Sequence, residues 1–250
     1  MSNKDQSLNK SSLSHPISRR SALTQLSVLG VITFSACGKN QRSQGSSAGA
    51  EAGTVAGAEA GTEMTFCEPT PSQIEGPYYL ELSDERLDIT EGRPGASLMM
   101  QLQVTNSDCS PISGALIEVW HADAAGVYSG FSGQSEETRG LDFLRGEAET
   151  DDNGNVQFSS IYPGWYPGRA VHVHFKVSLD GNTALTSQFY LPDDISVQIY
   201  QQDVYAERGE QDTPVPTDRF FLDAGEAKER LMASVEPNDS GYIAHLQITV

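Results

Sequence analysis

The sequence predicts an all-β fold over residues 65–250, an antiparallel β-sandwich with few short helices. Two observations predict it. Apolar residues alternate with polar ones in several short runs, which is the period of strands that bury one face. Turns rich in glycine, proline, asparagine and aspartate separate these runs, as is typical of sandwiches.

The predicted strands follow one another along this region. In the first, Leu98 to Val104, four apolar residues alternate with Met99, Gln101 and Gln103. The further runs are 115–120, 171–177, 185–190 and 242–250. The segment Asp151 to Gly154 predicts a hairpin turn because Asn-Gly supplies positive φ angles. The spacing and closing glutamate of a calcium loop are absent there. One helix is predicted at 225–234 from its helix-forming residues.

The first 37 residues have the pattern of an export signal. Ser18-Arg19-Arg20 precedes an uncharged stretch that is too short to span a bilayer and ends at Ser35-Ala36-Cys37. The arginine pair favours the twin-arginine route. The end resembles a lipoprotein processing site, with Cys37 as the lipidated residue, although Ala22 and Phe34 depart from the usual residues. Simple cleavage, or an amphipathic or disordered N-terminus, are the alternatives.

Residues 38–64 form a predicted linker of small and polar residues. The segment contains a tandem repeat, Ala48 to Val55 followed by Ala56 to Glu63, which cannot bury enough surface to offset the entropy of ordering. The whole chain has a net charge of −18. A surface this acidic disfavours nucleic acid and anionic lipid head groups as partners, so membrane contact is expected only through a lipid anchor.

The chain has three cysteines. If Cys37 is the processing site, Cys67 and Cys109 remain as a pair in an oxidising compartment, and we expect them to form a disulfide. The alternative is a pair of free buried thiols.

Two histidines lie on one face of the predicted strand at 171–177. His172 and His174 are two residues apart, so both imidazoles point the same way and one metal ion can reach both. A solvated strand face with no metal is the better interpretation of an isolated His-x-His. The nearby Tyr128, Tyr166 and Arg169 favour the metal site. His121 is interpreted as structural or as a residue that supports the metal ligands, His245 as structural, and Trp120, Trp165 and Phe175 as core or pocket wall.

The donor types indicate the metal. Neutral imidazole suits many transition metals. A free tyrosine has a pKa of about 10, so a phenolate ligand at neutral pH needs a strong Lewis acid. Two histidines and two tyrosines therefore favour ferric iron, which would keep a residual positive charge for a dianionic substrate such as a catecholate.

Several motifs in order resemble the intradiol ring-cleavage dioxygenases, which include catechol 1,2- and protocatechuate 3,4-dioxygenases. The resemblance runs from about Cys67 to at least Tyr190 and is specific as an ordered set. The segments are Glu75-Gly-Pro-Tyr-Tyr79, 117–129, Leu144-Arg-Gly146, Ile161-Tyr-Pro-Gly-Trp-Tyr-Pro167 and Arg169-Ala-Val-His-Val-His-Phe175. It looks especially like a short, exported branch with a cysteine pair and no helical dimerisation segment. It implies a transthyretin-like sandwich core, one Fe(III) per chain, and O₂ and a small catechol as substrates.

The resemblance also implies roles by position. Tyr128, Tyr166, His172 and His174 would be the iron ligands, and Tyr166 would leave the metal when substrate binds and take up a substrate proton. Arg169 would stabilise negative charge that develops on the substrate, and Gln188 would lie near the oxygen-binding region. The product would be a cis,cis-muconate-type diacid.

The sequence departs from the family pattern in two places, and two other functions are alternatives to the one that the resemblance implies. Ala170 stands where the family usually has proline, and the loops 131–143 and 191–217, which select the substrate, cannot be aligned. The main rival is a cell-surface β-sandwich binding module with a vestigial metal site. The other is a zinc or copper site without oxygenase activity. Oligomeric state stays open.

Overall fold

The computed structural model describes residues 67–82 and 85–250. The predicted export signal at 1–37, the lipidation site Cys37 and the linker at 38–64 lie outside the described residues. In the described part, no helix is long and apolar enough to cross a membrane.

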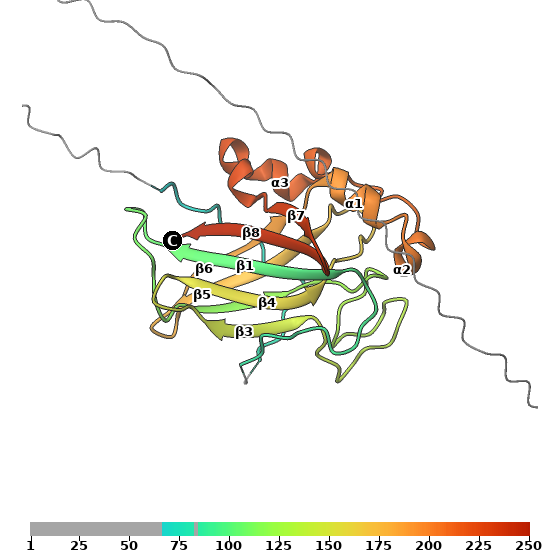
Figure 1. The fold of residues 1–250 in the computed structure, drawn as a ribbon, viewed down its shortest axis with the longest axis horizontal. Helices are drawn as coiled ribbons and strands as arrows, with labels where there is room; N and C mark the ends of the chain where they lie inside the picture. The colour runs from blue at the N-terminus through green and yellow to red at the C-terminus, as the bar shows by residue number, and fades with distance from the viewer. Residues whose placement is uncertain (1–66, 83–84) are drawn as a thin grey trace, which may run out of the picture. The chain divides into compact units, whose positions relative to one another are not determined.

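Two four-stranded sheets form the sandwich, which confirms the predicted fold class (Figure 1). The first sheet has the order β4-β1-β8-β7, with bounds Asn155–Ile161, Ser97–Thr105, Gly241–Thr249 and Ser234–Asn238. The second has the order β3-β2-β5-β6, with bounds Arg145–Glu149, Leu116–Trp120, His172–Leu179 and Asn182–Tyr190. All neighbours are antiparallel except β1 and β8, which are parallel. Parallel pairing is possible there because most of the domain lies between the two strands.

The core lies between the sheets and follows the alternation in the sequence. In β1, Leu98, Met100, Leu102 and Val104 are buried, as predicted. In β5, Val173, Phe175 and Val177 are fully buried in the same core. The opposite face of β5 is also buried, so the solvated strand face that a bare histidine pair would suggest is not present.

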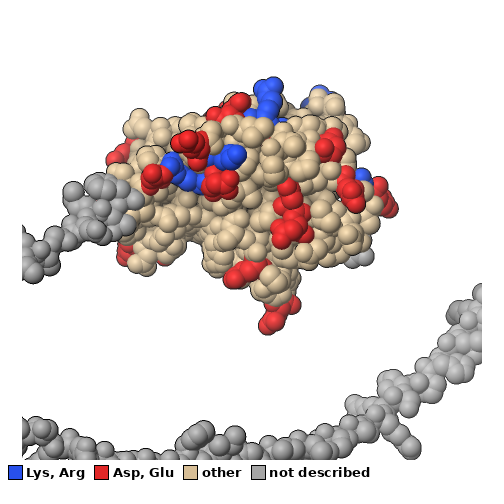
Figure 2. All heavy atoms as spheres, turned by 90° about the horizontal axis from the view of Figure 1, so that it is seen from above, with Lys and Arg blue, Asp and Glu red and all other residues tan. Residues whose placement is uncertain are grey.

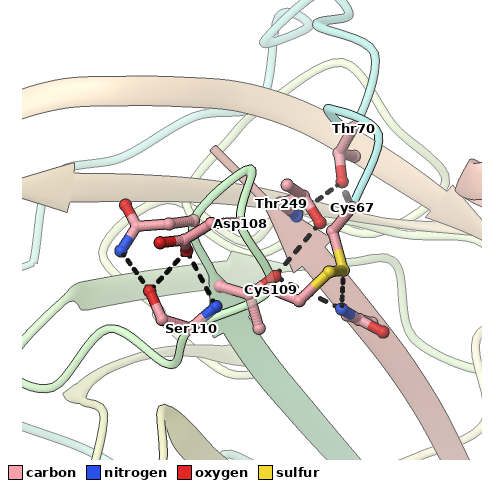
Figure 3. Close-up of a disulfide and its surroundings, with 9 residues drawn as sticks. Cys67, Thr70, Asp108, Cys109, Ser110 and Thr249 are labelled. Atoms are coloured by element: carbon pink, nitrogen blue, oxygen red, sulfur yellow. Dashed lines mark hydrogen bonds between the residues drawn. A yellow bond between two sulfur atoms is a disulfide. The ribbon is translucent and has the colours of Figure 1, made fainter. Parts of the chain in front are cut away.

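The segment 67–79 covers that second face. Cys67 is joined to Cys109 by a disulfide, and the Thr70 amide donates to the carbonyl of Thr249 in β8 (Figure 3). From the first sheet the segment crosses to the second, where the Gln73 amide donates to Thr186 of β6. The disulfide therefore fixes the start of the segment 67–79, which covers β5.

The segment 150–154 is a turn, but the predicted hairpin is wrong. Gly154 has a φ of 73°, and the Asp151 carboxylate accepts from the amides of Asn153 and Asn155. The turn leads from β3 in one sheet to β4 in the other, because the chain after it pairs with β1.

Short helices gather at one end of the sandwich (Figure 1). They are α1 Asp193–Ile199, α2 Asp203–Ala206, α3 Arg219–Asp223 and the 3₁₀ helices η1 Val215–Thr217 and η2 Gly225–Leu231. The helix predicted at 225–234 is therefore a 3₁₀ helix that ends early. The chain becomes extended at Met232 because it bridges to Tyr190 of β6, and tertiary pairing overrides helix propensity.

The surface is acidic, as the composition predicts. Figure 2 shows acidic side chains spread over the face seen from above Figure 1, with fewer basic ones among them. Basic groups such as Arg86 and Lys176 are paired with carboxylates, Asp142 and Glu75 respectively.

Candidate metal centre

Strand β5 places two imidazoles side by side in a buried site. His172 and His174 are 3% and 2% exposed, and their Nε2 atoms lie 3.2 Å apart. His172 Nδ1–H donates to the carbonyl of Ala170 at 2.6 Å, so the lone pair of Nε2 points into the site. Trp120 on β2 stacks on the His174 ring with a centroid distance of 5.2 Å. The Trp120 indole is therefore a wall of the site.

Two tyrosine hydroxyls meet the same imidazole. The hydroxyl of Tyr166 lies 3.1 Å from His172 Nε2, and that of Tyr128 lies 3.4 Å from it. Tyr128 is almost fully buried and stacks against Tyr78, with ring centroids 4.5 Å apart. Tyr166 lies on the loop after β4 and is only half-buried. The structure thus brings together the four predicted ligand side chains.

A tight turn after β2 presents Tyr128. The Asp123 carboxylate accepts from the amides of Ala125 and Val127, each at 2.9 Å, and pairs with Arg93. A side chain on Gly164 would lie 2.2 Å from the carbonyl oxygen of Ala124, so the loop that carries Tyr166 can pack against this turn only with glycine there. The two tyrosine-bearing loops therefore fix each other.

Burial keeps all four groups neutral. Burial, with the nearby Tyr166 as a smaller cause, raises the pKa of Tyr128 well above its usual value, and burial also raises the pKa of Tyr166. Burial lowers the pKa of His172 and the pKa of His174 well below the usual range. The imidazole lone pairs are thus free at neutral pH, while the phenols need a nearby cation to ionise.

This donor set fits a metal ion. Within residues 67–82 and 85–250, no group of three or more His, Cys, Asp and Glu side chains could hold a metal, so a metal at the histidine pair would need the tyrosines. The contacts of 3.1–3.4 Å to His172 Nε2 are the size expected between neighbouring ligands whose bonds to one ion are about 2 Å. Phenolate is a hard anionic donor, which suits a highly charged ion.

Arg169 extends the site on the side of Tyr166. Its Nη1 atom lies 3.5 Å from both the Tyr166 hydroxyl and His172 Nε2. Its Nη2 atom donates to Gln188 Oε1 at 2.6 Å. Arg169 and Gln188 are buried and lie together beside the four candidate ligand side chains.

The sequence analysis missed Asp218 and Tyr190. The Asp218 carboxylate is fully buried and accepts from Arg169 Nε at 2.8 Å, and the Tyr190 hydroxyl lies 3.4 Å from Arg169 Nη2. Asp218 precedes Arg219-Phe-Phe-Leu, and an aspartate before an apolar run is a signal for a helix N-cap. That signal predicts a cap but not its arginine partner.

The two remaining histidines in the described residues lie outside this cluster. His121 is buried and its ring nitrogens contact the Ala122 carbonyl and the Ser160 hydroxyl at 2.8 and 2.7 Å. His245 lies on the outer face of β8 near Glu236. Phe175 belongs to the core, and Trp165, which is partly exposed, packs against the same core cluster.

Comparisons with known proteins show the family of the chain. A family model described as Dioxygenase matches residues 74–235. Catechol 1,2-dioxygenase 1 of Acinetobacter lwoffii is 32% identical over 170 residues, which cover 58% of this chain and 53% of the relative. The chain thus spans about half the length of the curated relatives it matches.

Two solved structures are similar over nearly their whole length. An intradiol ring-cleavage dioxygenase from Tetranychus urticae has a TM-score of 0.68 and 28% identity, covering 73% of this chain and 94% of that chain. The dioxygenase domain of a dioxygenase carbohydrate-binding protein fusion from Streptomyces sp. SirexAA-E has a TM-score of 0.56 and 28% identity, covering 73% and 98%.

Proposed function

This chain belongs to the intradiol ring-cleavage dioxygenase family, and we propose from that premise that it opens the ring of a catechol between its two hydroxyl-bearing carbons, using O₂ and non-haem Fe(III). The product is a cis,cis-muconate-type diacid that carries both oxygen atoms. The observation that carries the proposal is the convergence of two tyrosine hydroxyls and two imidazole nitrogens in one buried site.

Tyr128, Tyr166, His172 and His174 are the residues that would hold one ferric ion. When bound, this ion supplies the positive charge that ionises the two tyrosines and the Lewis acidity that draws electron density from a catecholate ring. The neutral imidazoles require no proton loss to act as ligands.

Of the four side chains, Tyr166 is the one that would make room for substrate. Its side chain is half-buried, whereas Tyr128 is 1% exposed and is covered by Tyr78. The phenolate oxygen of Tyr166 would be a base beside the incoming catechol and would take up one of its protons. Arg169 Nη1 lies 3.5 Å from this oxygen and stabilises its negative charge before the proton arrives.

Arg169 also places a buried positive charge beside the ligands. A fixed cation in a water-poor site stabilises charge that develops on the substrate more strongly than it would in water. Gln188 accepts a hydrogen bond from the other terminal nitrogen of the guanidinium and so holds this edge of Arg169 in place. The rival binding module with a vestigial site would be favoured by a missing ligand, and none of the four is missing.

Isotope labelling tests the activity. Full-length chain loaded with Fe(III) is mixed with catechol under ¹⁸O₂, and the product is analysed by mass spectrometry. We expect a ring-opened diacid with two ¹⁸O atoms, lost in His172→Ala and retained in Tyr242→Phe, whose hydroxyl lies outside the site. Unchanged catechol, or a product with one labelled oxygen, would contradict the proposal.

We further propose that the protein is exported and anchored by a lipid on Cys37. The disulfide supports export, since such bonds persist in oxidising compartments. In cells, the full-length chain is expected in the membrane fraction with palmitate label, and Cys37→Ala is expected to lose both. A label that persists in Cys37→Ala would rule out this anchor.

A further inference from the structure

A buried carboxylate stands behind Arg169, on the side away from the metal ligands. Asp218 joins η1 to α3 and is fully buried. Its Oδ1 accepts from the amides of Phe220 and Phe221 at 2.8 and 3.2 Å, which caps α3. Its Oδ2 accepts from Arg169 Nε at 2.8 Å and from the Ala170 amide at 2.9 Å. One carboxylate thus joins α3 to the chain that enters β5.

Capping does not explain why this carboxylate is buried. Asparagine, serine or an exposed aspartate caps a helix equally well. A buried ion pair stabilises little in net terms because both charges are desolvated, whereas removing one partner is costly. The ionic partner of Asp218 in the described structure is Arg169, so the arrangement serves the placement of that arginine.

The guanidinium is held on three sides. Asp218 holds Nε, while Gln188 and Tyr190 take the two hydrogens of Nη2 at 2.6 and 3.4 Å. Phe220, the second residue of α3, covers the planar face with 4.5 Å from the guanidinium carbon to the ring centroid. The remaining nitrogen, Nη1, faces the Tyr166 hydroxyl and His172 Nε2.

The four side chains that hold the guanidinium, Asp218, Gln188, Tyr190 and Phe220, form a clamp. This clamp contacts the segment 67–79 that covers β5. The Tyr190 hydroxyl lies 3.1 Å from Gln73 Oε1, and Gln73 Nε2 donates to the carbonyl of Phe220. The clamp therefore includes elements far apart in the sequence, 73 near the start of the domain and 218–220 near its end. A shift of α3 would move both the carboxylate and the aromatic ring that hold Arg169.

We propose that Asp218 is a positioning residue for the ring-cleavage reaction, which fixes the Arg169 guanidinium so that its Nη1 edge faces the ligand atoms and the substrate. The inference rests on the proposed function for its catalytic consequence. The orientation of Arg169 can be tested without any catalytic activity.

Asp218→Asn separates this role from capping. Asparagine is as good an N-cap as aspartate, but when its one oxygen caps α3, its NH2 group cannot accept a hydrogen bond from Arg169. We expect kcat and kcat/KM for catechol to fall together by about 10²-fold, since a misplaced group fails in the transition state. In an Arg169→Ala background, Asp218→Asn is expected to cause no further loss. The matched control is Asp151→Asn, which should keep full activity. Asp151 also accepts from two backbone amides, and within the described residues it makes no ion pair with an arginine.

A second measurement needs no iron and no turnover. In the metal-free full-length chain, the Nε–H of Arg169 should exchange slowly with solvent by NMR, and Asp218→Asn should speed this exchange at least tenfold. Unchanged exchange, or an equal loss of kcat in both backgrounds, would show that Asp218 is only structural. If wild type does not cleave catechols, the proposed function fails, and the exchange measurement still decides the role of Asp218.

Asp218→Asn alone leaves Arg169 buried without its partner and could prevent folding. The double variant Asp218→Asn with Arg169→Ala leaves no such charge. Folding restored in the double variant would support the inference, and folding lost in both would overturn it in favour of a structural role.

Discussion

At the scale of single residues, burial sets the protonation of the candidate metal ligands. Tyr128, His172 and His174 are each at most 3% exposed, so the uncharged form of each side chain is favoured. A cation that enters this site meets two free lone pairs and two phenols that ionise only in its presence. The sequence could predict which four side chains converge, because His-x-His on a strand and the two tyrosines are local signals. The contacts that hold Arg169 could not be predicted, because Asp218 is 49 residues away in the sequence.

His121 provides a pH-dependent contribution to stability. Complete burial lowers its pKa from about 6.5 to about 4. Between about pH 6.5 and pH 4, His121 therefore binds a proton in the unfolded chain but not in the folded chain. The contribution of His121 to the free energy of unfolding is fully present above pH 6.5 and is lost as the pH falls through this window. Between pH 7.5 and 4.5 the loss should be about 2–3 kcal/mol.

Urea unfolding of the metal-free chain at the two pH values measures this. His121→Gln, which keeps a polar side chain without an acid–base centre in this range, should lose about 2–3 kcal/mol less stability than wild type on acidification. Both proteins keep His172 and His174, whose burial contributes equally to the two proteins; only the smaller charge interaction of these histidines with His121 differs. Equal losses in the two proteins would contradict the assignment.

At the scale of elements, local patterns predicted the strands, while pairing depended on distant contacts. Alternation in β1 and in β5 placed the correct residues in the core. The Asn-Gly turn at 151–154 was recognised, but its chemistry does not specify which strand the chain joins next, and the chain joins β1. Similarly, helix-forming residues at 225–231 form a 3₁₀ helix because β6 draws the following residues into an extended conformation.

The disulfide acts at this scale by anchoring the segment that covers β5. It joins residues 42 apart, and loss of a native disulfide typically costs about 2–4 kcal/mol. We expect Cys67→Ser with Cys109→Ser to lower the free energy of unfolding by this amount in urea. Ser107→Ala, in the same loop, is the control and should change it by less than about 0.5 kcal/mol. An unchanged midpoint in the double variant would show that the cover is held without the bridge.

At the scale of the whole molecule, the chain combines a domain that the family model matches with an N-terminal region outside that match. The family model covers 74–235, and the similar solved structures are matched over 94% and 98% of their length. The region 1–64 was interpreted from composition and short motifs alone. A twin-arginine route suits a metalloenzyme because that route can export a protein already folded around its metal.

We propose that Tyr128, Tyr166, His172 and His174 bind ferric iron. The most direct test is the visible absorption spectrum of the full-length chain with iron quantification, before and after anaerobic addition of catechol. We predict a coloured protein with about one iron per chain, whose absorption band arises from tyrosinate-to-iron charge transfer and shifts when catechol binds. A protein that stays colourless after ferric reconstitution, or that binds zinc or copper in place of iron, would contradict the account.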